Sequence, residues 1–155
     1  MIAKTEKHQY YFEVQLNWQQ GHKGILTAHD VKDTIHVATP TAFGGEPDVW
    51  SPEHLFLSSL SSCFMTTYLA IAEKRNLAIT DFECNAIGQI LLVKGHLEFV
   101  TINLFPKIFV DKEEEMVIAN EVMIKAYKHC IVANSIKPQL IHHGQVVLDK
   151  RHLVN

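Results

Sequence analysis

The sequence predicts an α+β fold in a single domain covering residues 1–155, with the element order βββ-α-ββ-α-β. Three observations support this prediction. Short apolar/polar alternations fill the first third, a long stretch without charged residues follows, and then come a two-strand hairpin and a second amphipathic helix. The length fits one domain, and an apolar fraction of 47% is enough to form a core.

Three strands are predicted in the first third. Residues 9–18 alternate apolar and polar side chains, which is typical of a half-buried strand, and a turn follows at Gly21. Residues 24–29 and 34–38 form the second and third strands. Residues 39–50 contain two prolines and two glycines and therefore predict a loop.

A long helix is expected over residues 52–75. Ser51 suits the N-cap, Pro52 the first helical position, and Asn76 the left-handed residue that closes the helix. Residues 55–72 carry no charge, so this helix must be covered on nearly all sides. One sheet and one further helix cannot cover all of them. We therefore expect a homodimer. Seven Ser, Thr and Cys residues in the same stretch favour burial in protein rather than in a membrane.

The second half predicts a hairpin, a helix and a last strand. The hairpin turns at Lys94-Gly95, and Pro106 predicts a sheet edge or a bulge in its second strand. Asp111 is expected to cap the second helix, with Glu114 completing a capping box. Residues 140–148 form the last strand.

Composition excludes several classes of function. The net charge is −3 and no basic cluster exists, so we expect no nucleic-acid binding. The segment 1–8 has no apolar stretch, so no secretory signal is predicted and a cytoplasmic location follows as the default. The three cysteines are too few for a disulfide scaffold and wrongly spaced for zinc, so no metal or other cofactor is expected.

The cysteines are the first candidates for chemistry. Cys63 lies in the long helix, where it is either a reactive thiol or a small residue in a tight helix contact. Cys130 lies where the second helix ends and is open to the same two interpretations. Cys84 falls on the apolar face of a strand, which favours a role in the core.

Two motifs carry a family resemblance. They are Ser-Pro-Glu-His-Leu-Phe-Leu from Ser51, with Cys63 ten residues after Glu53, and Cys-Ile-Val-Ala-Asn-Ser from Cys130. In these motifs and in its element order, nearly the whole chain resembles the OsmC/Ohr family of osmotically induced and organic hydroperoxide resistance proteins.

The resemblance implies a function and an assembly. It implies an OsmC-like fold, with two central helices packed against sheets in an intertwined homodimer. It also implies that Cys63 attacks an organic hydroperoxide, that Cys130 resolves the sulfenic acid as a disulfide, and that a lipoyl-type dithiol reduces this disulfide.

The chain departs from the family at one position. The family has an arginine in its N-terminal strands, held by the glutamate at the helix start, whereas the only arginines here are Arg75 and Arg151. A buried thiol needs a nearby positive charge to ionise, and Lys23, with His22 as alternative, is the candidate. The alternative interpretation, which the sequence favours for both residues, is a solvated hairpin turn.

Glu53 cannot touch Cys63 within one helix, because ten residues at 1.5 Å each separate their backbones by roughly 15 Å. It must therefore act through a cation or from the other subunit, or else only complement the helix dipole.

Three aromatic residues, Phe43, Trp50 and Phe56, could form an apolar mouth for a peroxide, or belong to the core or the dimer interface. Hydroperoxide reduction is the function predicted here. The alternatives are an apolar-ligand-binding protein of the same fold and a redox sensor with little peroxidase activity.

Overall fold

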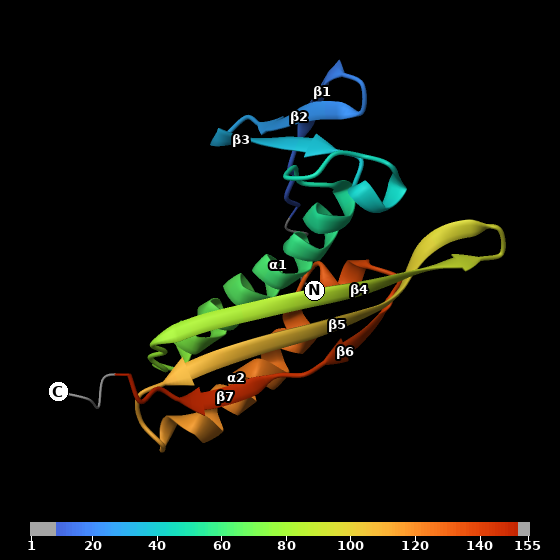
Figure 1. The fold of residues 1–155 in the computed structure, drawn as a ribbon. Helices are drawn as coiled ribbons and strands as arrows, with labels where there is room; N and C mark the ends of the chain where they lie inside the picture. Colours follow the sequence, from blue (N-terminus) through green and yellow to red (C-terminus); the bar gives the residue numbers. More distant parts are fainter. Residues whose placement is uncertain (1–8, 152–155) are drawn as a thin grey trace, which may run out of the picture. The chain divides into compact units, whose positions relative to one another are not determined.

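The computed structural model describes residues 9–151 (Figure 1). Residues 1–8, on which the expectation of no signal sequence rests, and residues 152–155 lie outside the described part. The chain forms two compact units, residues 1–55 and 56–155, and each is described by itself. The expectation of one OsmC-like domain stays a prediction.

The first unit contains an antiparallel sheet in the order β1-β2-β3, with β1 Gln15–Gln20, β2 Lys23–Ala28 and β3 Val31–Ala38. The prediction of a strand over residues 9–18 is wrong at its start. The first pair of this ladder is Gln15 with Thr27, one residue before β2 ends at Ala28, so the chain before Gln15 runs past the end of β2. β1 is also exposed along its whole length, not half-buried, because nothing within its unit covers it.

The loop after β3 includes a short 3-10 helix, η1 Thr41–Phe43, and returns to the sheet at Trp50, whose carbonyl accepts a hydrogen bond from the amide of Ala38 (2.8 Å). Ser51 then caps α1 Pro52–Lys74 as predicted, since its Oγ accepts from the amide of His54 at 3.3 Å. Asn76 closes the helix at φ 51°. Within residues 9–151, α1 alone is long and apolar enough to cross a membrane, a property that core helices share.

The second unit is organised around a long antiparallel hairpin of β4 Asp81–Val93 and β5 His96–Val110. Its turn uses Lys94 and Gly95 at positive φ, as predicted. The last predicted strand is present but interrupted, so that β6 Gln139–His142 and β7 Gln145–Leu148 pair in parallel with successive parts of β5. Pro106, which has no N–H to donate, lies between these two pairings.

The second helix, α2 Glu115–His129, begins later than expected, and the predicted cap by Asp111 is wrong. The amides of Glu115 and Met116 bond to the carbonyls of Lys112 and Glu113, so a backbone turn satisfies them without a side-chain cap. A short 3-10 helix, η2 Ala133–Ser135, follows α2.

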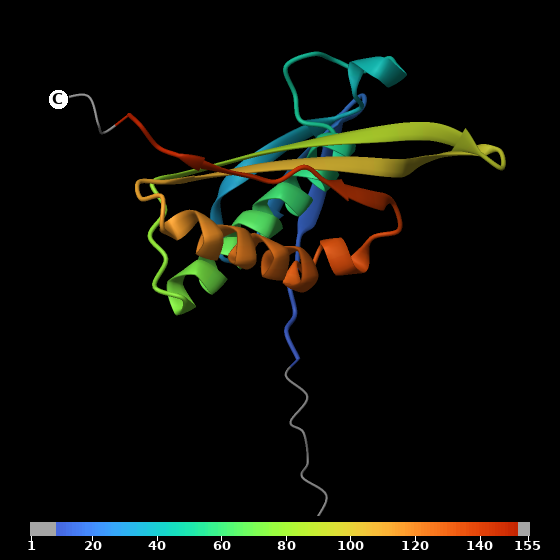
Figure 2. The ribbon, with the colours of Figure 1, turned by 90° about the horizontal axis from the view of Figure 1, so that it is seen from below.

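Both helices pack on one face of this sheet, as Figures 1 and 2 show for α2 and residues 56–74 of α1. The Tyr68 hydroxyl donates to the carbonyl of Ala119 (3.2 Å) and links the two helices. The core comprises Leu60, Phe64, Tyr68 and Ala72 of α1, Ile102, Leu104, Ile108 and Val110 of β5, and Ala119, Val122, Met123 and Ala126 of α2. This packing confirms the α+β fold and fixes the middle of α1 against the end of α2.

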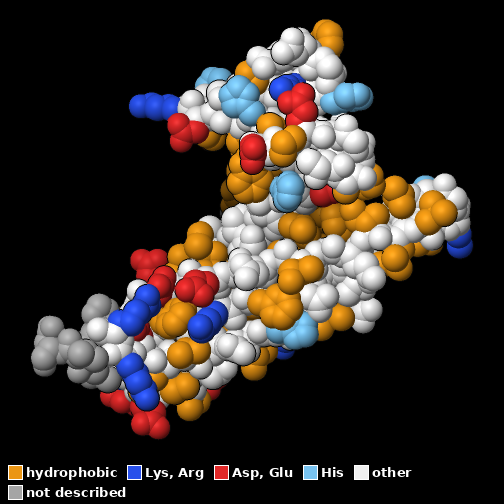
Figure 3. Space-filling model, in the orientation of Figure 1, with side chains coloured by type: hydrophobic (Ala, Val, Ile, Leu, Met, Phe, Trp, Pro, Cys, Tyr) orange, Lys and Arg blue, Asp and Glu red, His pale blue; other side chains and the backbone are white. Residues whose placement is uncertain are grey.

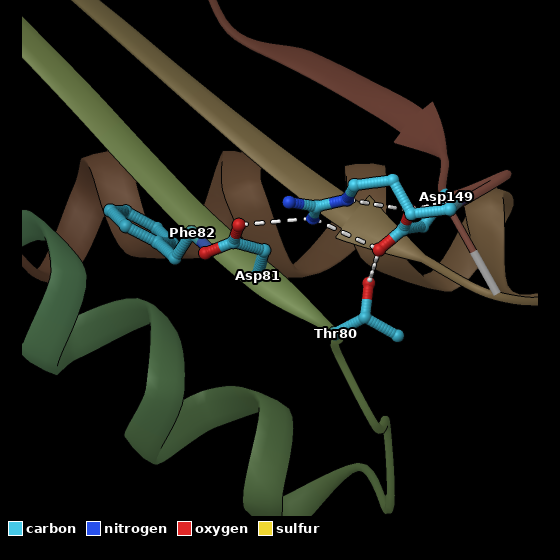
Figure 4. Close-up of polar contacts among 5 residues, drawn as sticks. Thr80, Asp81, Phe82 and Asp149 are labelled. Carbon is cyan, nitrogen blue, oxygen red and sulfur yellow. Dashed lines mark hydrogen bonds and ion pairs between the residues drawn. The ribbon is translucent and has the colours of Figure 1, made fainter.

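Hydrogen bonds and ion pairs join the end of β7 to the start of β4 (Figure 4). The buried carboxylate of Asp149 accepts hydrogen bonds from the Thr80 hydroxyl (2.7 Å) and the Arg151 guanidinium (2.9 and 3.0 Å). Arg151 also bonds Asp81 at 3.0 Å. The Arg151 and Thr80 hydrogen bonds hold the pKa of Asp149 well below its usual range.

Candidate functional site

The packing of α1 against α2 brings Cys63 and Cys130 together. Cys63 lies in the middle of α1 and is partly exposed, whereas Cys130 follows the last residue of α2 and is buried. Both thiols are free, and one hydrogen bond between them lowers the pKa of Cys63 and raises that of Cys130, which makes Cys130 the donor. The two residues in the family-like motifs are therefore neighbours in space.

Hydrogen-bond donors surround the thiol of Cys63. Partial burial raises its pKa, but the backbone amide of Val132, the thiol of Cys130, the amide of Ile131 and the Thr67 hydroxyl all lower it. The net effect is a pKa below the ordinary value for cysteine. Each donor favours the thiolate because it stabilises negative charge on the sulfur.

The local backbone explains how two amides reach one sulfur. Cys130 leaves α2 in an extended conformation (φ −65°, ψ 113°), and Val132 then enters η2 in a helical one. This change of direction turns the N–H groups of Ile131 and Val132 toward α1. Thr67 belongs to α1 itself, four residues after Cys63 and therefore on the same face.

Cys130 differs from Cys63 in its protonation. Burial raises the pKa of the Cys130 thiol, and the neighbouring Cys63 raises it further. The pair therefore combines a thiol of lowered pKa with a neighbouring thiol of raised pKa. Such a pair suits nucleophilic attack by Cys63 followed by condensation with Cys130.

Cys84 lies against the core on β4, as expected, and burial raises its pKa to about 11. Tyr127 on α2 is a neighbouring buried acid, and burial raises its pKa to about 12. Neither group supplies a cation to Cys63.

A cation beside Cys63 was predicted from the sequence. The groups that lower its pKa within the described residues are neutral donors instead. Only charged side chains were considered as groups that stabilise the thiolate. The sequence analysis therefore missed Thr67, Ile131 and Val132. The four-residue spacing of Thr67 from Cys63 does predict that both lie on one face of a helix. The direction of a backbone amide, in contrast, cannot be predicted from the sequence.

The other expected catalytic residues lie in the first unit. Lys23, His22, Phe43 and Glu53 line one cavity of about 380 Å³. Lys23 forms an ion pair with Glu46 (2.5 Å), and no ion pair joins it to Glu53. One carboxylate oxygen of Glu53, Oε2, is buried without a hydrogen-bond partner among the described residues. A role for Lys23 and Glu53 at the thiols stays a prediction.

The three aromatic residues of the expected apolar mouth fall in both units, so a mouth formed by them stays a prediction. Phe43 lines the cavity with Glu53, whereas Trp50 lines a separate hollow with His54 in the same unit. Phe56 belongs to the second unit, where its ring packs against Phe99 at 5.0 Å.

Together, the fold and the site define a small α+β protein with two free thiols in contact between its central helices. The OsmC-like protein family model matches residues 45–142, which is more than half of the chain. The chain therefore belongs to the OsmC-like family.

Among curated proteins, an uncharacterized Bacillus subtilis (strain 168) protein, YmaD, is 18% identical over 131 residues, covering 83% of this chain and 87% of its own length. Among solved structures, an OsmC-like protein of unknown function from Vibrio cholerae matches with a TM-score of 0.77 and 16% identity, over 90% of this chain and all of that one. An organic hydroperoxide resistance protein from Elizabethkingia anophelis matches with a TM-score of 0.71 and 19% identity, over 92% and 99% of the two chains. These likenesses confirm the fold.

Proposed function

We propose that this protein reduces organic hydroperoxides with Cys63 as the attacking thiol and Cys130 as the resolving thiol. The observation that carries the proposal is the contact between a thiol of lowered pKa and a thiol of raised pKa. Membership of a family that includes organic hydroperoxide resistance proteins supports the same reaction.

The reaction proceeds in three balanced steps. The Cys63 thiolate attacks the distal peroxide oxygen, the O–O bond breaks, and the alkoxide takes a proton and leaves as an alcohol, so that Cys63 becomes a sulfenic acid. The Cys130 thiol then displaces water from this sulfenic acid and forms a disulfide. A dithiol of the lipoyl type reduces the disulfide, becomes oxidised itself and restores both thiols.

Homodimerisation through α1 is part of the proposal. The exposed face of α1 carries small residues, and its hydroxyls are already bonded within the helix: Ser59 to the carbonyl of Phe56 (2.7 Å), Ser62 to that of Ser58 (2.6 Å) and Thr66 to that of Cys63 (3.1 Å). A face without free donors can be buried at little cost in lost hydration.

Apolar residues near the end of the β4–β5 hairpin add to the surface available for dimerisation. Leu91, Leu92 and Leu97 are exposed there, and Figure 3 shows hydrophobic side chains gathered over this hairpin. Monomeric proteins seldom leave such residues uncovered in a group. We place the dimer in the cytoplasm, where reducing conditions keep its thiols free.

We also propose that Lys23 and Glu53 act on the Cys63 thiol. A further part of the proposal is an apolar mouth for the peroxide, formed by Phe43, Trp50 and Phe56. Lys23 and Glu53 line one cavity, which supports a shared role for these two residues.

Thiol titration tests the function directly. Free thiols are counted before and after one equivalent of cumene hydroperoxide, and again after addition of dihydrolipoamide. We expect two thiols per chain to disappear and to return, with steady turnover under excess dithiol. Retention of all thiols would instead favour a ligand-binding protein, and oxidation with poor turnover would favour a redox sensor. A Cys63→Ser variant is the matched control and should lose none.

A further inference from the structure

The cavity of the first unit has an unusual distribution of charge. Its walls are mostly apolar and include Leu16, Trp18, Val37 and Phe43. The titratable residues that line it are His22, Lys23 and Glu53. At about 380 Å³ it falls within the size range of small-molecule sites.

The positive charge of Lys23 is already matched. Its Nζ lies 2.5 Å from Oε2 of Glu46, so this ammonium group is held by a carboxylate that does not line the cavity. The carboxylate of Glu53, by contrast, lines the cavity and forms no ion pair among the described residues.

Glu53 takes no part in the hydrogen bonds that cap α1. Ser51 already caps α1 through its Oγ, and the amide of Ser51 is matched in return by Nδ1 of His54 (3.2 Å). The Oε2 atom of Glu53 is nevertheless buried and has no hydrogen-bond partner in the described chain. Burial without a partner is costly for a carboxylate, so such a group usually has a partner that is not part of its own chain.

We propose that this cavity binds a small organic molecule with an apolar body and a protonated amine, and that Glu53 binds the amine. The apolar walls take the hydrocarbon part, and the carboxylate accepts a charge-assisted hydrogen bond from the ammonium group. Trp18 is suitably placed to report on binding, because its indole lines the cavity and is held by a hydrogen bond to the carbonyl of Gly21 (3.0 Å). This inference goes beyond the proposed reduction of peroxides and does not require either cysteine.

The test compares three probes of equal chain length: hexylamine, hexanol and hexanoate. Each is titrated at pH 7 against the full-length protein while the fluorescence of Trp18 is followed in a Trp50→Phe background, and calorimetry on the unmodified protein serves as a second readout. We expect hexylamine to bind roughly tenfold or more tightly than hexanol, and hexanoate to bind more weakly than both.

Two variants test whether the Glu53 carboxylate determines the preference for the amine. Glu53→Gln keeps the shape of the side chain and should abolish the preference for the amine. Asp48→Asn removes an equal charge from the same unit outside this cavity and should preserve it; Asn tolerates the φ of 63° found there. Thermal unfolding of each variant checks that it is folded.

The inference is overturned if the native protein fails to bind hexylamine, if hexanoate binds as well as hexylamine, or if the preference survives Glu53→Gln. Because none of these probes is a peroxide, a Cys63→Ser protein should give the same binding series. Loss of peroxidase activity and loss of amine binding are therefore separate outcomes.

Discussion

Thr67 offers a sharp test of how the Cys63 thiolate is stabilised. Its hydroxyl is one of four donors that lower the pKa of Cys63. Replacing Thr67 by Val removes this donor and keeps a β-branched side chain of similar shape in α1. The pKa of Cys63 should rise, because burial would then be opposed by fewer hydrogen bonds.

The size of the effect follows from the energy of one hydrogen bond. A single donor to a partly exposed sulfur contributes on the order of 0.7–1.4 kcal/mol, and 1.36 kcal/mol corresponds to a tenfold change in ionisation. At pH values below the pKa of Cys63, the thiolate fraction should therefore fall roughly threefold to tenfold. Alkylation by iodoacetamide should slow by the same factor, since the thiolate is the reacting form.

The assay is peptide-resolved mass spectrometry of iodoacetamide labelling between pH 5 and 9, which follows Cys63 separately from the other thiols. Thr66→Val is the matched control, because the Thr66 hydroxyl donates to the carbonyl of Cys63 at 3.1 Å and not to its sulfur. Thr67→Ser retains the donor and should behave like the native protein. Equal rates for Thr67→Val and Thr66→Val would refute the reasoning.

Lys23 can be examined with the same assay. If the expected cation acts on Cys63 in the assembled protein, Lys23→Met should slow alkylation in addition to the effect of Thr67→Val, and His22→Gln tests the alternative cation. Unchanged rates in both variants would leave the hydrogen-bond donors of the second unit as the stabilising groups.

Four further predictions follow from the fold. Peptide mapping after peroxide treatment should find a Cys63–Cys130 disulfide, and Cys84→Ser should leave its yield unchanged; any disulfide that contains Cys84 counts against this. Sedimentation at micromolar concentration should give a dimer, and a stable monomer would exclude the proposed use of α1. Gly144→Ala should lower the free energy of unfolding by about 1–3 kcal/mol, measured by urea denaturation, because a Cβ there overlaps two side chains of α2. The folded-state pKa of Asp149 is lowered, so its contribution to stability is present above its ordinary pKa and is lost as the pH falls; Asp149→Asn should reduce Tm at pH 7 and flatten the decrease of Tm on acidification.

Local chemistry made several elements of the fold predictable. Ser51 and Pro52 mark the start of α1 and Asn76 marks its end, because each residue suits a backbone position that few others tolerate. Lys94-Gly95 located the hairpin turn for the same reason. The start of β1 was missed because a strand extends only as far as its partner, and the end of β2 is set by the fold rather than by the residues before Gln15.

The site was predictable only in part. Motif resemblance selected Cys63 and Cys130, and the structure brings them into contact. The donors around Cys63 could not be predicted in the same way, since two of them are backbone amides whose direction depends on how the chain leaves α2. The bonds of Asp149 to Thr80 and of Arg151 to Asp81 join residues about seventy positions apart, with no local pattern to reveal them.

Neutral donors and a cation are not equivalent ways to stabilise a thiolate. A cation attracts anions from solution and is screened by salt, whereas oriented amides act at short range and are held in place by the backbone. A chain that stabilises Cys63 with the amides of Ile131 and Val132 can therefore lose an arginine and still keep a reactive thiol. Its reactivity then depends on the extended conformation of Cys130, which directs those amides. In the proposed reaction Cys130 thus has two effects on Cys63: its thiol forms the disulfide, and its backbone sets the direction of the donors that favour the thiolate.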